Sequence, residues 1–128
     1  MVLCGLINKD IVAIISKYSK ESGAIGLSGL DSKLIQATII KKTIKGEDGV
    51  EQQVDLGRVG YPDPSRVNVH LIKSLLGIKL VPVIAPVGYD ADTGKSLNIN
   101  ADTAAGAVAQ ALQARHNRGL NFEDIYDF

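Results

Sequence analysis

The sequence predicts an α/β protein, a three-layer αβα sandwich with a mainly parallel sheet and an added β-hairpin. Short apolar segments bounded by glycine or polar turns, which are typical of buried strands, alternate with longer segments whose apolar residues recur every three or four positions, which is typical of helices. In addition, the 128 residues are 45% hydrophobic and 22% charged. That balance fits one globular domain.

Composition also excludes several classes of function. The 14 basic and 14 acidic side chains give a formal net charge of zero, so there is no basic field to attract phosphate backbones or anionic lipid. We therefore expect neither nucleic acid nor a membrane among the partners. Cys4 is the only cysteine, which excludes an internal disulfide. It has no second cysteine and no clustered histidines with which to form a zinc site, and a lone cysteine fits a reducing compartment. No apolar run indicates a signal peptide or a spanning helix.

Residues 8–20 are expected to form the first helix. Apolar side chains fall at helical spacing on one face, namely Ile11, Ile14, Ile15 and Tyr18. Asn8 is a credible N-cap, and Gly23 is a stop signal. Residues 24–27 are apolar and bounded by glycines, so they predict a buried strand, and the polar turn at 28–31 completes the order of an α/β unit.

A β-hairpin is predicted next. Hydrophobic and polar residues alternate at 40–44 and again at 50–54, and the Glu-Asp-Gly sequence at 47–49 supplies turn chemistry. The lysines and carboxylates that flank this turn indicate a solvated rim.

The second half predicts a helix, a strand and a further helix. Residues 67–76 form an amphipathic stretch closed by Gly77, with Val67, Leu71, Ile72, Leu75 and Leu76 inward. Residues 80–87 are nearly all apolar, as in a central parallel strand that opens at Gly88. Residues 102–115 predict an alanine-rich helix whose inward stripe is Ala105, Val108, Ala109 and Leu112.

The character of the chain changes after Arg115. We therefore expect a domain over residues 1–115 and a divergent C-terminal tail over residues 116–128. Two alternatives are open for the tail: a separate segment, or a terminal strand or helix packed on the core. Its apolar residues are sufficient for packing, namely Leu120, Phe122, Ile125 and Tyr126.

Two glycine groups are candidate ligand contacts. Gly57 and Gly60 flank Arg58 and Val59, while Gly26 lies within the first predicted strand and Gly29 follows it. Neither group matches a standard phosphate-binding loop. Gly57 and Gly60 either face a ligand through their backbone amides or serve only as turn formers.

A polar row precedes the last predicted helix. In an extended stretch, Asn98, Asn100 and Asp102 project from one side, because side chains alternate along a strand. The unpaired amides of the following helix N-terminus favour an anion, and Asp102 can cap them or hold a lysine in place. This pattern predicts a carboxylate or phosphate site. The alternative is an ordinary N-cap after an Asn-rich turn.

Four segments together resemble the acetylglutamate kinases of the amino acid kinase superfamily. They occur in the family's order and approximate spacing, and they read GLSGLDSKLI at 26–35, VDLGRVG at 54–60, PVIAPVG at 82–88 and NINADTAA at 98–105. The last segment is the most specific. The resemblance covers about residues 2–115 and implies a partial amino acid kinase fold.

The resemblance also implies a reaction. The family transfers the γ-phosphoryl group of ATP, with Mg²⁺, to the side-chain carboxylate of N-acetyl-L-glutamate in arginine biosynthesis. It implies that Asn98 binds acetylglutamate and that Asp102 orients catalytic lysines; Asn100, Gly57 and Gly60 are further ligand-facing candidates. Family members form homo-oligomers, and some bind a nitrogen-signalling regulator. The implied compartment is the cytoplasm, or a plastid if a transit peptide has been lost.

Departures from the family pattern set a second expectation. Residues 1–128 contain neither of the two catalytic lysine segments nor the substrate arginine, and residues 61–66 are longer than the usual connection. We therefore expect a central fragment with negligible kinase turnover by itself, since each lost transition-state donor costs about 2.7–4 kcal/mol. The alternative is a non-catalytic interaction module that associates with full-length kinase subunits or with the nitrogen regulator.

Overall fold

The computed structural model describes residues 3–116, so the predicted tail at 117–128 lies outside the described residues. The elements in chain order are a π-helical turn Leu3–Ile7, α1 Asn8–Tyr18, β1 Gly23–Ser28, a 3₁₀ turn Asp31–Lys33, β2 Ile35–Lys45, β3 Glu51–Val67, α2 Val69–Gly77, β4 Leu80–Ala85, β5 Val87–Asp90, β6 Ser96–Asn98 and α3 Ala101–His116. This order confirms the predicted α/β class. None of the described helices is long and apolar enough to cross a membrane.

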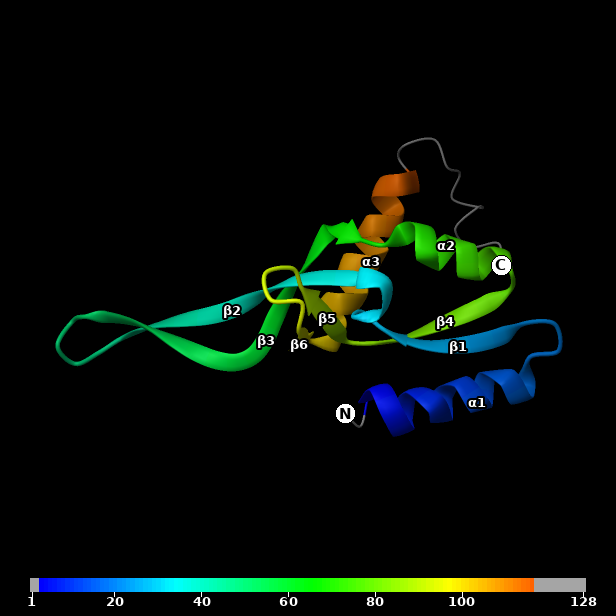
Figure 1. Ribbon diagram of the computed structural model, residues 1–128, viewed down its shortest axis with the longest axis horizontal. Coiled ribbons are helices and arrows are strands. Elements are labelled where there is room, and N and C mark those ends of the chain that lie inside the picture. Colours follow the sequence, from blue (N-terminus) through cyan, green and yellow to red (C-terminus); the bar gives the residue numbers. More distant parts are fainter. Residues whose placement is uncertain (1–2, 117–128) are drawn as a thin grey trace.

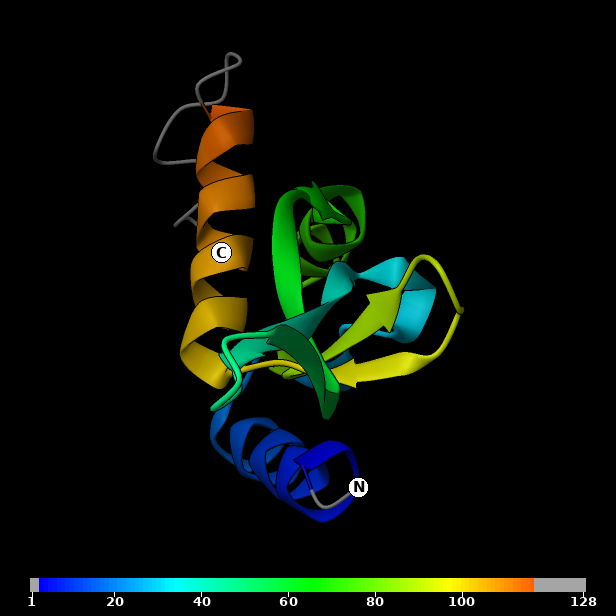
Figure 2. The same cartoon turned by 90° about the vertical axis from the view of Figure 1, so that its left-hand side faces the viewer.

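A parallel pair of strands forms the middle layer. β1 and β4 pair in register from Gly23 opposite Leu80 to Ser28 opposite Ala85. Helix α1 lies on one face of this pair and α2 on the other (Figures 1 and 2). The predicted layers and the strand predicted at 24–27 are therefore confirmed, whereas the strand predicted over 80–87 ends at Ala85, and Val87 and Gly88 belong to β5 in another sheet.

The other four strands close into a small barrel in the order β2, β3, β6, β5. β2 and β3 form the predicted hairpin, with a turn in which the Gly49 N–H donates to the Gly46 carbonyl over 2.9 Å. The hairpin continues outside the barrel as a two-stranded ribbon (Figure 1). Both strands of the hairpin are longer than the sequence indicated. In particular, β3 continues through two prolines as far as Val67.

Two bulges allow β3 to change partners. Between the pairs Ile39–Gly60 and Lys41–Asp55, β2 contributes one residue and β3 contributes four. Gly57 lies in this bulge with φ of +80°, a backbone conformation that glycine adopts without steric cost. The bulge frees Val59 from β2, and Val59 pairs instead with Asn98 of β6.

The barrel interior is narrow and requires glycine at two positions. A Cβ on Gly60 would lie 2.8 Å from Leu97 Cδ1 and 3.2 Å from Ala37 Cβ. A Cβ on Gly88 would lie 2.5 Å from Ile99 Cδ1 and 2.9 Å from Ala37 Cβ. Since real carbon atoms do not approach so closely, these two glycines let the strands close on the apolar side chains.

Asn8 is not the N-cap that the sequence predicted. The π-helical turn runs directly into α1, so the preceding residue, Ile7, already has helical backbone angles. The Asn8 side chain is 3% exposed, and its Nδ2 donates to the carbonyl oxygens of Leu27 at 3.3 Å and Val83 at 3.0 Å. Asn8 therefore ties α1 to both strands. As a result, Ile14 and Tyr18 of the predicted apolar stripe face solvent.

The other two helices also depart from the predicted details. The left-handed residue after α2 is Lys79, with φ of +63°, rather than Gly77. The most deeply buried face of α3 carries Ala104, Ala107 and Ala111, and of the predicted stripe Val108 and Leu112 also pack against this core, partly buried. Small side chains on this face allow α3 to lie close to β3, so Ala105 and Ala109 remain exposed.

Candidate functional site

The barrel fixes the position of Asn98. Its backbone pairs with Val59 of β3 on one side and with Val87 of β5 on the other. Leu97 and Ile99, its neighbours in sequence, are 2% and 6% exposed and point into the core, so the Asn98 side chain points outward. No hydrogen bond of the Asn98 side chain is found within residues 3–116. This amide is therefore held in place by its backbone and available to a ligand.

Arg58 supports the same strand from the bulge. Its Nε and Nη2 donate to the carbonyl oxygen of Ser96 over 3.0 and 2.8 Å. Both donors of one guanidinium edge thus act on β6, two residues before Asn98. Sequence reasoning treated Arg58 only as a spacer between glycines. The signal that sequence reasoning missed is a basic side chain between two glycines. In the structure this side chain lies in the bulge and reaches the neighbouring strand β6.

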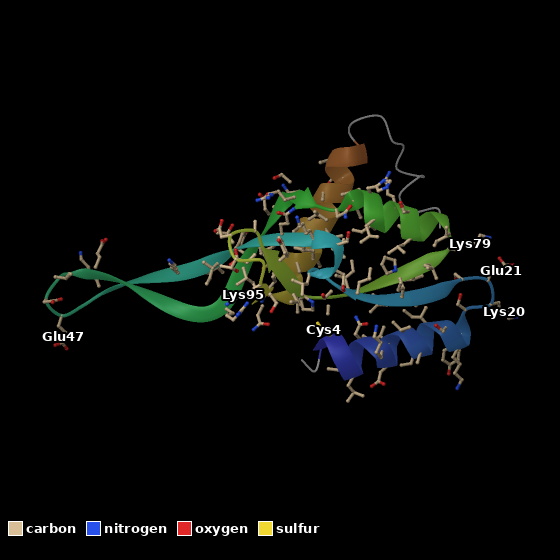
Figure 3. All side chains as sticks on the ribbon, in the orientation of Figure 1. Cys4, Lys20, Glu21, Glu47, Lys79 and Lys95 are labelled. Atoms are coloured by element: carbon tan, nitrogen blue, oxygen red, sulfur yellow. The ribbon has the colours of Figure 1, made fainter. Side chains whose placement is uncertain are left out.

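The turn between β5 and β6 is held by Asp90, which is 5% exposed. The backbone N–H of Asp92 donates to Asp90 Oδ1 at 3.0 Å, and the Thr93 hydroxyl donates to Oδ2 at 2.9 Å. These hydrogen bonds hold the pKa of Asp90 below its usual value. Because the folded-state pKa is lowered, the contribution to stability is present at neutral pH and is lost as the pH falls through the folded pKa. Lys95, labelled in Figure 3, follows this turn.

Asn100 and Asp102 have different surroundings. The extended stretch ends at Asn98 and α3 begins at Ala101, so Asp102 lies in the first turn of a helix. Asn100 Oδ1 accepts from the Thr103 N–H at 3.1 Å and from its hydroxyl at 3.3 Å, which is N-cap geometry. The expectation of one extended row of three side chains is therefore wrong, because the helix starts earlier than predicted.

Asp102 borders a hollow between β3 and α3. The hollow has a volume of about 400 Å³, and its wall on β3 includes Tyr61 and Pro62. The wall on α3 includes Asp102, Thr103 and Gln110. Asn98 is not part of this lining. Tyr61 and Pro62, which follow Gly60, thus line the same hollow as Asp102, an arrangement that the sequence did not predict.

The structure brings some of the candidate residues together. The pairing of Val59 with Asn98 places the glycine segment 57–60 beside the start of the polar segment 98–102. Gly60 itself is buried, and the side on which a Cβ would stand faces Leu97 and Ala37. Gly57 is exposed at the bulge. Contact of either glycine with a ligand stays a prediction.

Two features of the described residues bear on the expected binding of ATP with Mg²⁺. No three acidic, histidine or cysteine side chains gather in the part of the chain that the structure describes. The glycines at 57–60 lie inside a strand rather than in a loop before a helix. An exposed amide such as that of Asn98 can donate a hydrogen bond to an anionic ligand, and the exposed Asp102 carboxylate can attract a cation.

Comparison with protein-family models matches residues 1–122 to the Amino acid kinase family. The chain therefore belongs to the amino acid kinase family. The matched region extends past Arg115, and the proposed boundary between domain and tail stays a prediction.

Curated relatives narrow the likeness to acetylglutamate kinases. The chain is 47% identical over 115 residues to the acetylglutamate kinase of Solidesulfovibrio magneticus, covering 90% of this chain and 37% of that protein. It is 48% identical to that of Rhodospirillum centenum, with 89% and 36% covered, and 46% identical to that of Methanocaldococcus jannaschii, also with 89% and 36% covered. The chain thus spans little more than a third of the length of these relatives.

The two asparagines are predicted to separate stability from binding. Asn100→Ala removes the N-cap of α3 and should lower the free energy of unfolding by about 0.5–2 kcal/mol. Asn98→Ala removes no hydrogen bond within the described chain and should change the free energy of unfolding by less than about 0.5 kcal/mol. Urea denaturation of both variants measures the difference. Equal losses in the two variants would show that Asn98 has a structural partner.

Proposed function

We propose that this chain is the acceptor-binding part of an acetylglutamate kinase. The reaction forms a bond between an oxygen of the side-chain carboxylate of N-acetyl-L-glutamate and the γ-phosphorus of ATP, while the bond from that phosphorus to the β,γ-bridging oxygen breaks. The products are an acyl phosphate and ADP. The observation that carries the proposal is the Asn98 side chain, fixed by strands on both sides and unpaired within residues 3–116.

This chemistry suits the residues that are present. A carboxylate that attacks a polyanion is already deprotonated, so it requires positioning and neutralisation of charge rather than a general base. The Asn98 amide can donate to an acidic acceptor without adding charge. Asp102, exposed at the first turn of α3, is placed to hold a cationic side chain close to the transferred group.

The remaining machinery comes from outside residues 3–116. The proposed reaction takes ATP with Mg²⁺, and residues 1–128 lack the two catalytic lysine segments that the resemblance leads us to expect. We therefore propose that the chain by itself turns over negligibly. We further propose arginine biosynthesis as the pathway and the cytoplasm as the compartment, as the resemblance to acetylglutamate kinases implies.

Binding of N-acetyl-L-glutamate to the complete chain tests the proposal. We expect weak, saturable chemical-shift changes at Leu97, Asn98 and Ile99 in an NMR titration, and no such changes in Asn98→Ala. Gln113→Ala, which removes an exposed amide elsewhere on the surface, should bind as the unsubstituted chain does. An isotope-transfer assay with ATP should show no turnover.

Two results would contradict the proposal. Unchanged binding in Asn98→Ala would remove Asn98 from the site. Turnover close to that of a full-length kinase would show that the chain holds the donor site after all.

A second candidate function is that of an interaction module, and the surface of α1 favours it. Five large apolar side chains are exposed on α1 and on the π-helical turn before it, including Ile14 at 57% and Tyr18 at 76%. The set is Leu6, Ile7, Ile11, Ile14 and Tyr18. The last four are spaced four, three and four residues apart, which is the spacing of a coiled-coil seam. We propose that this seam supports the expected homo-oligomer, or contact with full-length subunits or a nitrogen regulator.

The charges beside this seam favour an antiparallel pair. If Ile11 lies opposite Ile14 of a second copy, Asp10 lies opposite Lys17 of that copy and the reverse contact forms too. In a parallel pair Asp10 would face Ile15, so no ion pair would form there. Two copies of α1 are thus complementary in charge when they pack antiparallel.

Association through this seam is predicted to depend on Ile14. Ile14→Glu places a charge in the seam and should convert a dimer to a monomer in light scattering after size exclusion. Ser16→Glu adds the same charge at an exposed position of α1 away from the seam and should leave the dimer intact. A monomer for the unsubstituted chain at high concentration would refute self-association.

A further inference from the structure

The short strand β6 is held unequally by its two neighbours. Toward β5 it forms three register pairs, which run from Asn98 opposite Val87 to Ser96 opposite Tyr89. Toward β3 the described residues form one pair, Asn98 opposite Val59. Because ladder hydrogen bonds fix a strand in place, the start of β6 depends on β5 alone unless a further group connects it to β3.

The backbone carbonyl of Ser96 faces β3. Successive residues of a strand direct their backbone groups to opposite edges. The Asp90 N–H donates to the Lys95 carbonyl at 2.9 Å, so residue 95 faces the β5 side. Ser96 and Asn98 therefore direct their backbone groups toward β3. Since the ladder on that side reaches only Asn98, the Ser96 carbonyl needs a donor from another source.

Arg58 of β3 is that donor. Its Nε and Nη2 donate to the Ser96 carbonyl oxygen at 3.0 and 2.8 Å. The donors belong to a charged, planar guanidinium, so their direction is fixed and each hydrogen bond is stronger than one between neutral groups. Asn98 follows two residues later, about 7 Å along the strand. The side chain of Arg58 thus adds a second connection between β3 and β6, next to the candidate ligand group.

The charge of Arg58 also acts on the turn before β6. Asp90 holds this turn through the hydrogen bonds from the Asp92 N–H and the Thr93 hydroxyl. These hydrogen bonds are the main cause of the lowered pKa of Asp90, and the positive charge of Arg58 lowers that pKa further by a smaller amount. The guanidinium is therefore close enough to this carboxylate to favour the same arrangement of β5 and β6.

We propose that Arg58 is a positioning residue for the Asn98 amide. Its guanidinium ties the start of β6 to β3 and thereby holds the Asn98 side chain in the direction in which an acidic ligand meets it. The identity of that ligand rests on the proposed function, whereas the connection between the two strands does not.

The alternation of side chains indicates that Arg58 acts through the strand rather than by contact with the ligand. The side of Gly60 on which a Cβ would stand faces Leu97 and Ala37 inside the barrel. Arg58 lies two residues before Gly60, so its side chain starts from that same face of β3. Asn98 points outward, to the opposite side. Arg58 and Asn98 therefore share a strand pair but not a face.

Arg58→Met tests the inference on the complete chain, because it keeps an unbranched apolar stem and removes both donors. If Asn98 is then in its binding orientation about a tenth of the time, the Kd for N-acetyl-L-glutamate in an NMR titration should rise about tenfold. Amide hydrogen exchange at residues 96–98 should accelerate by about the same factor, while Ile35 in the core keeps its rate.

Two further variants serve as controls. Arg58→Lys keeps the charge and one kind of donor, so it should recover part of the affinity and part of the protection from exchange. Arg66→Met makes the same change at another exposed arginine of β3 and should leave both measurements unchanged.

Four results would overturn the inference. Unchanged exchange at residues 96–98 in Arg58→Met would show that Arg58 does not hold β6, and equal acceleration at Ile35 would show a general loss of stability. A higher Kd without faster exchange would place Arg58 in contact with the ligand. Faster exchange with an unchanged Kd would leave Arg58 a structural role only.

The exchange measurement requires no ligand. If the unsubstituted chain does not bind N-acetyl-L-glutamate, the proposed function fails, and exchange at residues 96–98 still decides whether Arg58 holds the strand that carries Asn98.

Discussion

The pairing of β6 on both sides is the constraint on which the rest of the structure depends. Asn98 is the position at which β6 meets both β3 and β5, and this double pairing closes the barrel. Closure requires Gly60 and Gly88, because a side chain at either position would overlap the apolar residues inside. The same closure directs the Asn98 amide outward. Packing inside the barrel and exposure of the candidate ligand group are thus two consequences of one arrangement.

The start of α3 follows from that closure. Once β6 ends at Asn98, Ile99 turns into the core and Asn100 caps the helix, so Asp102 falls in the first turn beside the β3 wall. The site is therefore built on a short, rigid strand and a helix terminus rather than on a mobile loop. The chain belongs to the amino acid kinase family and is similar to acetylglutamate kinases, and this geometry is the basis for the acceptor site that we propose.

Periodicity and turn chemistry were sufficient to predict the helices, the parallel strands and the hairpin. They could not predict which face of a helix is covered, since that depends on the partner surface. Asn8 is buried in α1 because two strand carbonyls accept from its amide, and alanines cover β3 because only small side chains fit there. Neither the bulge at Gly57 nor the contact from Arg58 to Ser96 could be predicted from the sequence, because both depend on how separate strands pair with one another.

Substitution at Gly88 tests the central claim most directly. Gly88→Ala would place a methyl group against Ile99 and Ala37, so the free energy of unfolding should fall by about 1–3 kcal/mol, and amide exchange at Leu97, Asn98 and Ile99 should accelerate. Gly106→Ala makes the same chemical change in α3, where no atom apart from the nearby backbone of the helix itself lies within 4 Å of the new Cβ, and should be neutral or stabilising. Unchanged stability and unchanged exchange in Gly88→Ala would contradict the account.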